Sequence, residues 1–207
     1  MRQKRFEALY HLSKKLKAEI KKPKPKAELL EKLFDELYSY ATRDHLTGAF
    51  NRRVLDELLG KEMERAIRHN LPLSAIILDI DNFKSYNDKY GHLQGDMALK
   101  TVTKIVQKLI RKEDFVARYG GEEFIMVLPD TTLAKAKEIA ERIRKKITET
   151  KIPAVSKEVE GGYERVTISL GVAQMSKQGI RHMLQQADAA LYRAKALGKN
   201  RVCVANN

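Results

Sequence analysis

The sequence predicts an α/β fold in which one mixed β-sheet is flanked by helices, preceded by a helical extension. Two observations support this fold class. From about residue 44, short apolar runs typical of strands alternate with longer segments whose apolar residues recur every three or four positions. Before that point only the helical spacing occurs. Since such an alternation favours a sheet packed against helices, we expect an N-terminal extension over residues 1–41 and one domain over residues 42–207.

The extension is expected to form two amphipathic helices separated by prolines. Pro23 and Pro25 interrupt the helical pattern because proline lacks an amide donor and restrains the residue before it. The two apolar stripes could pack on the domain or pair with another chain, but fewer than three clean heptads are present for a coiled coil. The stripes consist of Phe6, Leu9, Leu12, Leu16 and Ile20, followed by Leu29, Leu30, Leu33, Leu37 and Tyr40.

Each element of the domain is expected from its apolar spacing or from its turn residues. Gly120-Gly121 predicts a hairpin between two strands, and Thr131-Thr132 is a candidate cap for the next helix. The expected order is a helix over 52–70, a strand over 74–79, a helix over 96–111, strands over 115–119 and 123–128, a helix over 132–150, a strand over 166–174, a helix over 180–197 and a strand over 202–205.

Composition places the protein among globular chains of a reducing compartment. The 207 residues are enough for a domain with its own core. A single cysteine, Cys203, excludes an internal disulfide framework. No apolar run approaches the roughly 18 residues of a membrane span, and the N-terminus lacks the apolar core of a secretory signal. We therefore expect a cytoplasmic protein with no membrane segment.

The net charge of +13 is concentrated near the N-terminus. Residues 1–26 carry ten Lys and Arg against two Glu, which leaves a net charge of only +5 for the rest of the chain. A solvated helical face and an anionic partner both explain such a basic tail. Because the domain itself is only mildly basic, we do not expect nucleic acid to be a partner.

Four acidic residues gather around one strand end and one hairpin. Asp79 closes an apolar strand, whereas Asp81 suits a turn or a helix cap. Glu122 and Glu123 should point to opposite faces of an extended strand, so only one of them is expected to meet Asp79. Like charges repel unless they are protonated or bridged by a cation, and carboxylate oxygens suit Mg²⁺. Spacing alone leaves open a magnesium–phosphate site or a structural hairpin.

Other common sites are absent from the sequence. No Walker A pattern occurs, which excludes a P-loop nucleotide site. The five histidines are too scattered to suggest a zinc site: His11, His45, His69, His92 and His182.

Five motifs together resemble the GGDEF family of diguanylate cyclases over roughly residues 42–205. They are DHLTGAFNRR, LDIDNFKSYNDKYGHLQGD, RYGGEEF, TISLGVA and ADAALYRAKALGKNRV, in that order. The resemblance implies a fold related to the palm of polymerases and adenylate cyclases. It also implies that two GTP molecules are joined into cyclic di-GMP with release of two pyrophosphates.

By position in these motifs, the resemblance implies a metal site and two catalytic residues. Asp79, the carbonyl of Ile80 and Glu122 would hold Mg²⁺, with Mn²⁺ as a substitute. Glu122 would also help to deprotonate the attacking 3′-hydroxyl, although a metal lowers the pKa of a bound hydroxyl and can supply this activation itself. Lys84 would stabilise the charge that develops on the phosphoryl group.

The resemblance also implies contacts to the phosphates. The amides of Asn82 and Phe83 would approach them at the start of a helix, where unpaired donors favour anions. Lys195 and Lys199 would hold the terminal phosphates. Many relatives carry arginine at the second of these positions, so Lys199 keeps the charge but not the bidentate geometry.

Asn87 and Asp96 correspond to the pair that reads guanine. A carboxylate accepts hydrogen bonds from the ring N1–H and the 2-amino group of guanine, whereas adenine presents an acceptor at N1. Each residue also has a local explanation, in which Asn87 ends a helix and Asp96 caps the start of the helix that continues through Leu99.

An inhibitory product site is implied by an RxxD pattern five residues before GGEEF. It is formed by Arg111 and Asp114, and Arg142 on the next helix would assist. Guanidinium groups suit the edges and phosphates of cyclic di-GMP. A salt bridge at a helix end is the alternative explanation for RxxD.

The implied reaction requires a homodimer, because each subunit presents one GTP and the two must attack each other. The N-terminal helices are where dimerisation or control could act. The main alternative to an enzyme is an inactive GGDEF module that senses GTP or cyclic di-GMP by binding it.

Overall fold

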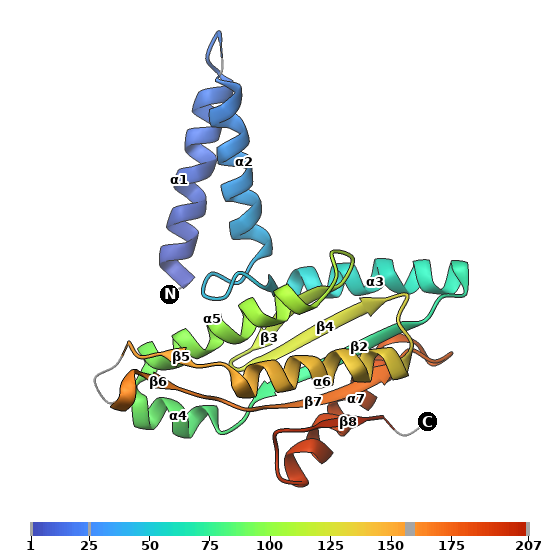
Figure 1. The fold of residues 1–207 in the computed structure, drawn as a ribbon. Coiled ribbons are helices and arrows are strands. Elements are labelled where there is room, and N and C mark those ends of the chain that lie inside the picture. Colours follow the sequence, from blue (N-terminus) through green and yellow to red (C-terminus); the bar gives the residue numbers. More distant parts are fainter. Residues whose placement is uncertain (1, 25, 156–159, 206–207) are drawn as a thin grey trace. The chain divides into compact units, whose positions relative to one another are not determined.

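The computed structural model describes residues 2–24, 26–155 and 160–205, in two compact units, Met1–His45 and Leu46–Asn207 (Figure 1). Two sequence predictions, the apolar role of Phe6 and the interruption at Pro25, lie outside the residues or side chains described. No helix in the described ranges combines the length and the apolar character needed to cross a membrane.

The first unit is a pair of helices, α1 (Arg2–Ile20) and α2 (Ala27–Thr42), as predicted. Leu33 of α2 is buried in the pair. Glu19, at the end of α1, is also buried and accepts hydrogen bonds from Lys22 Nζ at 2.5 Å and from the backbone amide of Lys26 at 3.1 Å. These bonds lower the pKa of Glu19, so its charge is satisfied at the turn between the helices.

The second unit contains one mixed six-stranded sheet, which confirms the predicted fold class. The strand order is β1-β3-β4-β2-β7-β8, in which β1–β3 and β7–β8 are parallel and the other pairs are antiparallel. The predicted hairpin joins β3 to β4, and Gly121 adopts a φ of 46° in its turn. The strands are β1 (Phe50–Asn51), β2 (Leu73–Ile80), β3 (Phe115–Gly120), β4 (Glu123–Pro129), β7 (Ile168–Gln174) and β8 (Val202–Val204).

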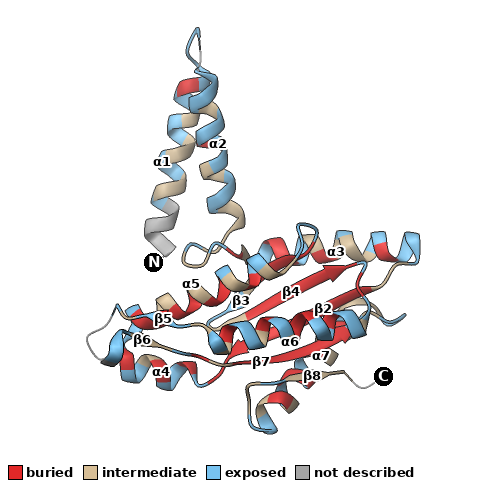
Figure 2. Cartoon of the chain, viewed as in Figure 1, coloured by how far each residue is buried: buried red, intermediate tan, exposed pale blue. Residues whose placement is uncertain are grey.

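Helices cover both faces of this sheet, which is why its central strands β2, β4 and β7 are buried along most of their length (Figure 2). Ile76, Leu78 and Ile80 of β2 belong to the core beneath α4, α5 and α6. Ala75 and Ile77 belong to the core beneath α3 and α7. The helices are α3 (Arg52–His69), α4 (Phe83–Tyr90), α5 (His92–Leu109), α6 (Leu133–Glu149) and α7 (Gly179–Ala196).

Local signals set several helix starts. The side chain of Asn51 accepts a hydrogen bond from the amide of Val54 and caps α3. Thr132 accepts one from the amide of Lys135 and caps α6, which confirms the candidate cap.

The helix α7 approaches β7 closely at Gly171, where a Cβ would lie 2.0 Å from the carbonyl oxygen of Ala187.

Some elements differ from the prediction. The strand β2 continues through Asp79 to Ile80, and α5 begins at His92, four residues before its expected start. The strand β7 begins two residues later than expected. Two-residue strands are too short to show any period, which is why three were missed: β1, β5 (Ile152–Pro153) and β6 (Tyr163–Glu164). The last two form a small separate sheet.

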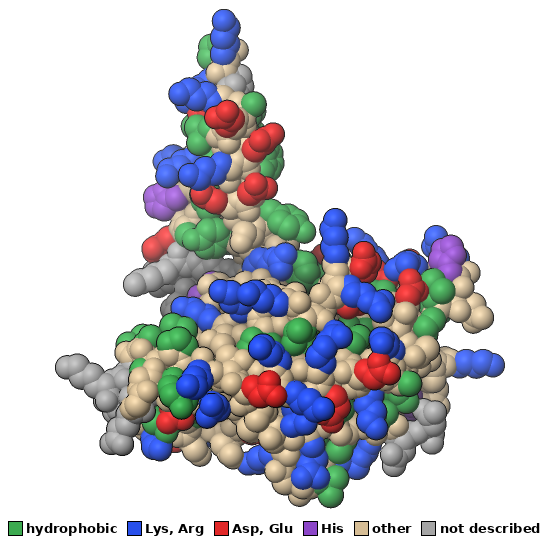
Figure 3. All heavy atoms as spheres, in the orientation of Figure 1, with side chains coloured by type: hydrophobic (Ala, Val, Ile, Leu, Met, Phe, Trp, Pro, Cys, Tyr) green, Lys and Arg blue, Asp and Glu red, His purple; other side chains and the backbone are tan. Residues whose placement is uncertain are grey.

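On the face drawn in Figure 3, Lys and Arg are interspersed with Asp and Glu. Such a mixed distribution differs from the single-signed stripe typical of nucleic-acid-binding surfaces.

Candidate functional site

The acidic cluster lies at the end of β2. Asp79 is 6% exposed, and Glu123 of β4 is its direct partner in the antiparallel register. Directly opposed residues of an antiparallel pair place their side chains on the same face of the sheet. The expectation that Glu123 faces away from Asp79 is therefore wrong. Glu122 belongs to the turn before β4, and the β3–β4 register shifts between Arg118 and Gly120, so strand alternation does not separate the two glutamates.

The electrostatics of Asp79 reflect this crowding. Burial raises its pKa, and the nearby charges of Glu122 and Glu123 raise it further. Lys195 opposes the rise, because its Nζ lies 2.8 Å from Oδ2 of Asp79. A carboxylate with a raised pKa between two other carboxylates gains free energy from an added cation.

Lys195 reaches Asp79 from α7, which covers the same face of the sheet. Gly171 of β7 permits the close approach of this helix, since a Cβ there would also lie 2.3 Å from the amide nitrogen of Leu191. The absence of one side chain in the sheet therefore helps to set the position of the lysine.

The start of α4 lies beside this cluster. Asn82 precedes the helix in a left-handed conformation with φ 55°, and its Oδ1 accepts a hydrogen bond from the ammonium group of Lys199. Lys199 has a φ of 61° in the loop after α7. The structure thus brings together Asn82 and Lys199, two of the residues predicted to contact phosphates, at a helix N-terminus. Phe83 is buried in the first turn of α4, and Lys84 is exposed there.

Asp81 holds this arrangement together. Its carboxylate accepts hydrogen bonds from the hydroxyls of Thr167 at 2.7 Å and Ser169 at 2.6 Å, and from the amide of Asn200 at 3.0 Å. The expectation of a turn residue accounts for the position of Asp81. It does not account for these bonds, which join the loop before α4 to β7 and to the loop of Lys199.

The predicted metal donors have the chemistry that Mg²⁺ requires. Asp79 and Glu122 offer carboxylates and Ile80 a carbonyl, all of them hard oxygen donors. Among the residues described, no three His, Cys, Asp or Glu side chains are arranged to hold a metal ion by themselves. Two carboxylates and a carbonyl suit Mg²⁺, which keeps waters and binds together with substrate phosphates rather than in an all-protein cage.

Asn87 and Asp96 lie on consecutive helices. Oδ1 of Asn87 is buried and has no hydrogen-bond partner among the described residues. The backbone carbonyl of Asn87 accepts the amide of Gly91 at 2.8 Å, so this residue lies in the last turn of α4 but does not end the helix, which continues to Tyr90. Asp96 is partly exposed in the second turn of α5. The alternative that it caps this helix is wrong, because α5 begins at His92.

The RxxD residues meet at the end of α5. Asp114 is buried, and its Oδ2 accepts the backbone amide of Arg111 at 2.9 Å. Burial raises the pKa of Asp114, whereas the bond and charge of Arg111 and the charge of Arg142 lower it. Arg142 donates to the carbonyl of Leu109 at 2.7 Å. Both arginine side chains are exposed, so the structure places two guanidinium groups around one buried acid.

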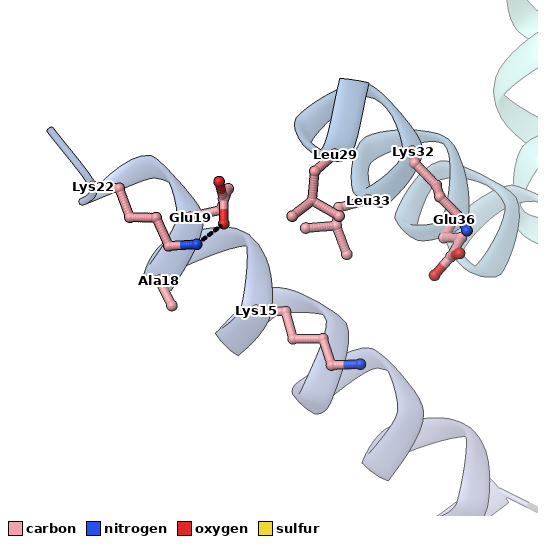
Figure 4. A pocket seen from close by; sticks show the side chains of 8 residues that line it. All are labelled: Lys15, Ala18, Glu19, Lys22, Leu29, Lys32, Leu33 and Glu36. Atoms are coloured by element: carbon pink, nitrogen blue, oxygen red, sulfur yellow. Dashed lines mark hydrogen bonds and ion pairs between the residues drawn. The ribbon is translucent and has the colours of Figure 1, made fainter. Parts of the chain in front are cut away.

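One hollow lies beside these residues, and another lies in the first unit. One, of about 330 Å³, begins at Asp81 and Asn82 and extends between α4 and the segment 164–167. The other, of about 370 Å³, lies within the helical pair of the first unit. There Leu29 and Leu33 point from α2 toward α1, beside the Lys22–Glu19 ion pair (Figure 4). None of the predicted site residues lines this second hollow.

Comparison with known proteins gives a match over most of the chain. The family described as diguanylate cyclase, GGDEF domain, matches residues 41–201. The diguanylate cyclase DosC of Escherichia coli is 38% identical over 176 residues, which cover 84% of this chain and 37% of DosC. The chain thus spans well under half the length of this curated relative.

Solved structures of similar proteins share the fold. The GGDEF domain of DgcB from Caulobacter crescentus, in complex with c-di-GMP, is 32% identical with a TM-score of 0.75, covering 81% of this chain and 94% of that one. The active GGEEF domain of a diguanylate cyclase from Vibrio cholerae is 36% identical with a TM-score of 0.67, covering 76% of this chain and 97% of that one.

Proposed function

The chain belongs to the GGDEF-domain family of diguanylate cyclases, and on this basis we propose that it condenses two GTP into cyclic di-GMP with release of two pyrophosphates. The observation that carries the proposal is the cluster at the end of β2. A buried acid, Asp79, meets Lys195 there, and two glutamates lie nearby. A cation site of this kind next to a helix N-terminus suits phosphoryl transfer.

Asp79, the carbonyl of Ile80 and Glu122 would hold Mg²⁺, or Mn²⁺ in its place. When bound, the ion would polarise phosphoryl oxygens and lower the pKa of the attacking 3′-hydroxyl. Glu122, in the turn between β3 and β4, accepts the proton of that hydroxyl. Lys84, exposed in the first turn of α4, stabilises charge on the phosphoryl group.

The remaining contacts bind and orient the substrate. The amides of Asn82 and Phe83 bind phosphate oxygens at the start of α4. Lys195 and Lys199 hold the terminal phosphates. Without substrate, Lys195 pairs with Asp79 and Lys199 donates a hydrogen bond to Asn82. These contacts keep both lysines oriented toward the site before substrate arrives.

Asn87 and Asp96 select guanine. The Asp96 carboxylate accepts the ring N1–H and the 2-amino group, which adenine cannot donate. Asn87 brings a side-chain amide whose oxygen is buried and has no hydrogen-bond partner in the described part of the chain.

The enzyme acts as a homodimer and is inhibited by its product. Each subunit contributes one GTP, so two sites face each other across a two-fold axis. Arg111, Asp114 and Arg142 form the inhibitory site, since their exposed guanidinium groups lie around a buried carboxylate. The structure of the DgcB domain in complex with c-di-GMP supports product binding by a domain of this fold.

The test is a product assay with GTP and Mg²⁺, using the parent, Glu122→Gln and a control, Glu149→Gln, at an exposed acid of α6. We expect cyclic di-GMP from the parent and the control. Glu122→Gln should lose at least about 100-fold in rate while GTP binding is retained. A folded dimer of the parent that binds GTP but forms no product would instead favour the inactive sensor module.

A further inference from the structure

Gly95 lies in the second turn of α5, where alanine would be the better helix former. Its backbone is not in the left-handed region, so chain geometry does not require glycine here. The surrounding space does require glycine at this position. A Cβ at this position would lie 1.8 Å from Oδ1 of Asn87, 2.9 Å from its Cγ and 3.2 Å from Cζ of Phe83.

The side-chain amide of Asn87 therefore occupies the volume that any other residue at position 95 would fill. Oδ1 of this amide is buried with no hydrogen-bond partner among the residues described. Packing against the bare helix surface thus sets the position of the amide. The backbone of Asn87 is fixed separately, by the bond from the amide of Gly91 to its carbonyl.

We propose that Gly95 is a positioning residue for base recognition: its missing side chain lets the amide of Asn87 lie against α5, next to Asp96. The inference rests on the proposed function, in which Asn87 and Asp96 read guanine. It adds that Asn87 and Asp96 can read guanine together only while position 95 is glycine.

The consequence of a substitution follows from which atoms collide. At Gly171 a Cβ meets backbone atoms of α7, which cannot move without shifting the helix. At Gly95 the closest atom is the end of a flexible side chain, which can rotate away. Gly95→Ala should therefore keep the fold and displace the Asn87 amide.

The experiment is a double-mutant cycle of Gly95→Ala and Asn87→Ala, read out as nucleotide binding with Mg²⁺. The probes are the guanosine and adenosine triphosphates whose α,β-bridging oxygen is replaced by methylene. We expect Gly95→Ala to weaken guanosine analogue binding about 10-fold, as Asn87→Ala does, and the double variant to bind as weakly as Asn87→Ala alone. Binding of the adenosine analogue and the melting temperature should not fall.

Three results would overturn the inference. They are unchanged guanosine binding in Gly95→Ala, an equal loss for both nucleotides, or a further loss when Gly95→Ala is added to Asn87→Ala. If Gly95→Ala melts far below the parent while the double variant does not, the contact between Gly95 and Asn87 serves stability and not base recognition. If the parent itself shows no preference for the guanosine analogue, the proposed function fails and this inference fails with it.

Discussion

Glu123 lies directly opposite Asp79 in the antiparallel register of β2 and β4. Asp79 thereby has Glu122 and Glu123 as charged neighbours, with Lys195 as the opposing cation. Burial and the two glutamates raise the pKa of Asp79, and Lys195 lowers it, so its charge responds to substitutions in β4 and α7.

The first prediction concerns this balance. Glu123→Gln removes a negative neighbour, so the pKa of Asp79 should fall, although burial still holds it above the ordinary carboxyl value. The carboxyl ¹³C resonance of Asp79, titrated without metal, measures the change directly. Glu149→Gln on α6 serves as the control and should leave the titration of Asp79 where it is. A rise in this pKa in Glu123→Gln would contradict the electrostatic assignment.

The second prediction concerns stability and pH at Asp114. Burial raises its pKa in the folded protein, so the unfolded chain loses this proton at lower pH than the folded one. Stability from the protonated acid is therefore present at low pH and is lost as pH rises through the folded pKa. Asn at this position cannot ionise and still offers an acceptor to the Arg111 amide. The free energy of unfolding of Asp114→Asn relative to the parent should increase from pH 4 to pH 7, by roughly 1.4 kcal/mol for each unit of pKa shift.

The control for this second prediction is Asp88→Asn, at an exposed acid of α4. Its melting temperature should follow that of the parent across the same pH range. A parent that gains stability over Asp114→Asn with rising pH would show that the paired arginines outweigh burial.

The third prediction concerns the contact between α7 and β7. Gly171→Ala places a Cβ against three backbone atoms of α7, so the free energy of unfolding should fall by about 1–3 kcal/mol. Denaturant titration measures it. Gly60→Ala in α3 is the matched control, because nothing lies within 4 Å of its Cβ position, and it should gain about 0.5–1 kcal/mol. Equal effects of the two substitutions would mean that α7 does not depend on this contact.

The fourth prediction concerns product inhibition. Arg142→Ala removes a guanidinium group beside Asp114, so the concentration of cyclic di-GMP that halves the rate should rise at least about 10-fold. The rate without added product should change little, because Arg142 is outside the catalytic cluster. Lys145→Ala, at an exposed base of the same helix, should be inhibited like the parent. Unchanged inhibition in Arg142→Ala would remove this residue from the site.

The order of elements and the hairpin were predictable because apolar spacing is a local property of the chain. Thr132 shows the same for a cap, since its partner lies three residues away. The orientation of Glu123 was predicted wrongly, because strand alternation applies only within a regular strand and Glu122 lies in the turn before β4. The register shift at the turn is not visible in the residue types.

Other parts of the site depend on contacts between distant segments. An isolated glycine in a helical pattern singles out Gly95 as unusual, but only the structure identifies Asn87 as the side chain that fills its space. Gly171 reads as an ordinary glycine in a strand until α7 is placed over it. Such contacts require the fold itself and cannot be read from spacing.

The bonds of Asp81 have a consequence for synthesis of the protein on the ribosome. One of them reaches Asn200, 119 residues further along the chain. The loop before α4 therefore lacks one of its partners until Asn200 has been made. A nascent or truncated chain that ends before this residue would have β2 and α4 but would lack part of the proposed phosphate-binding site. Competence to bind nucleotide should thus appear only after Asn200 has been made, when most of the sheet can already form.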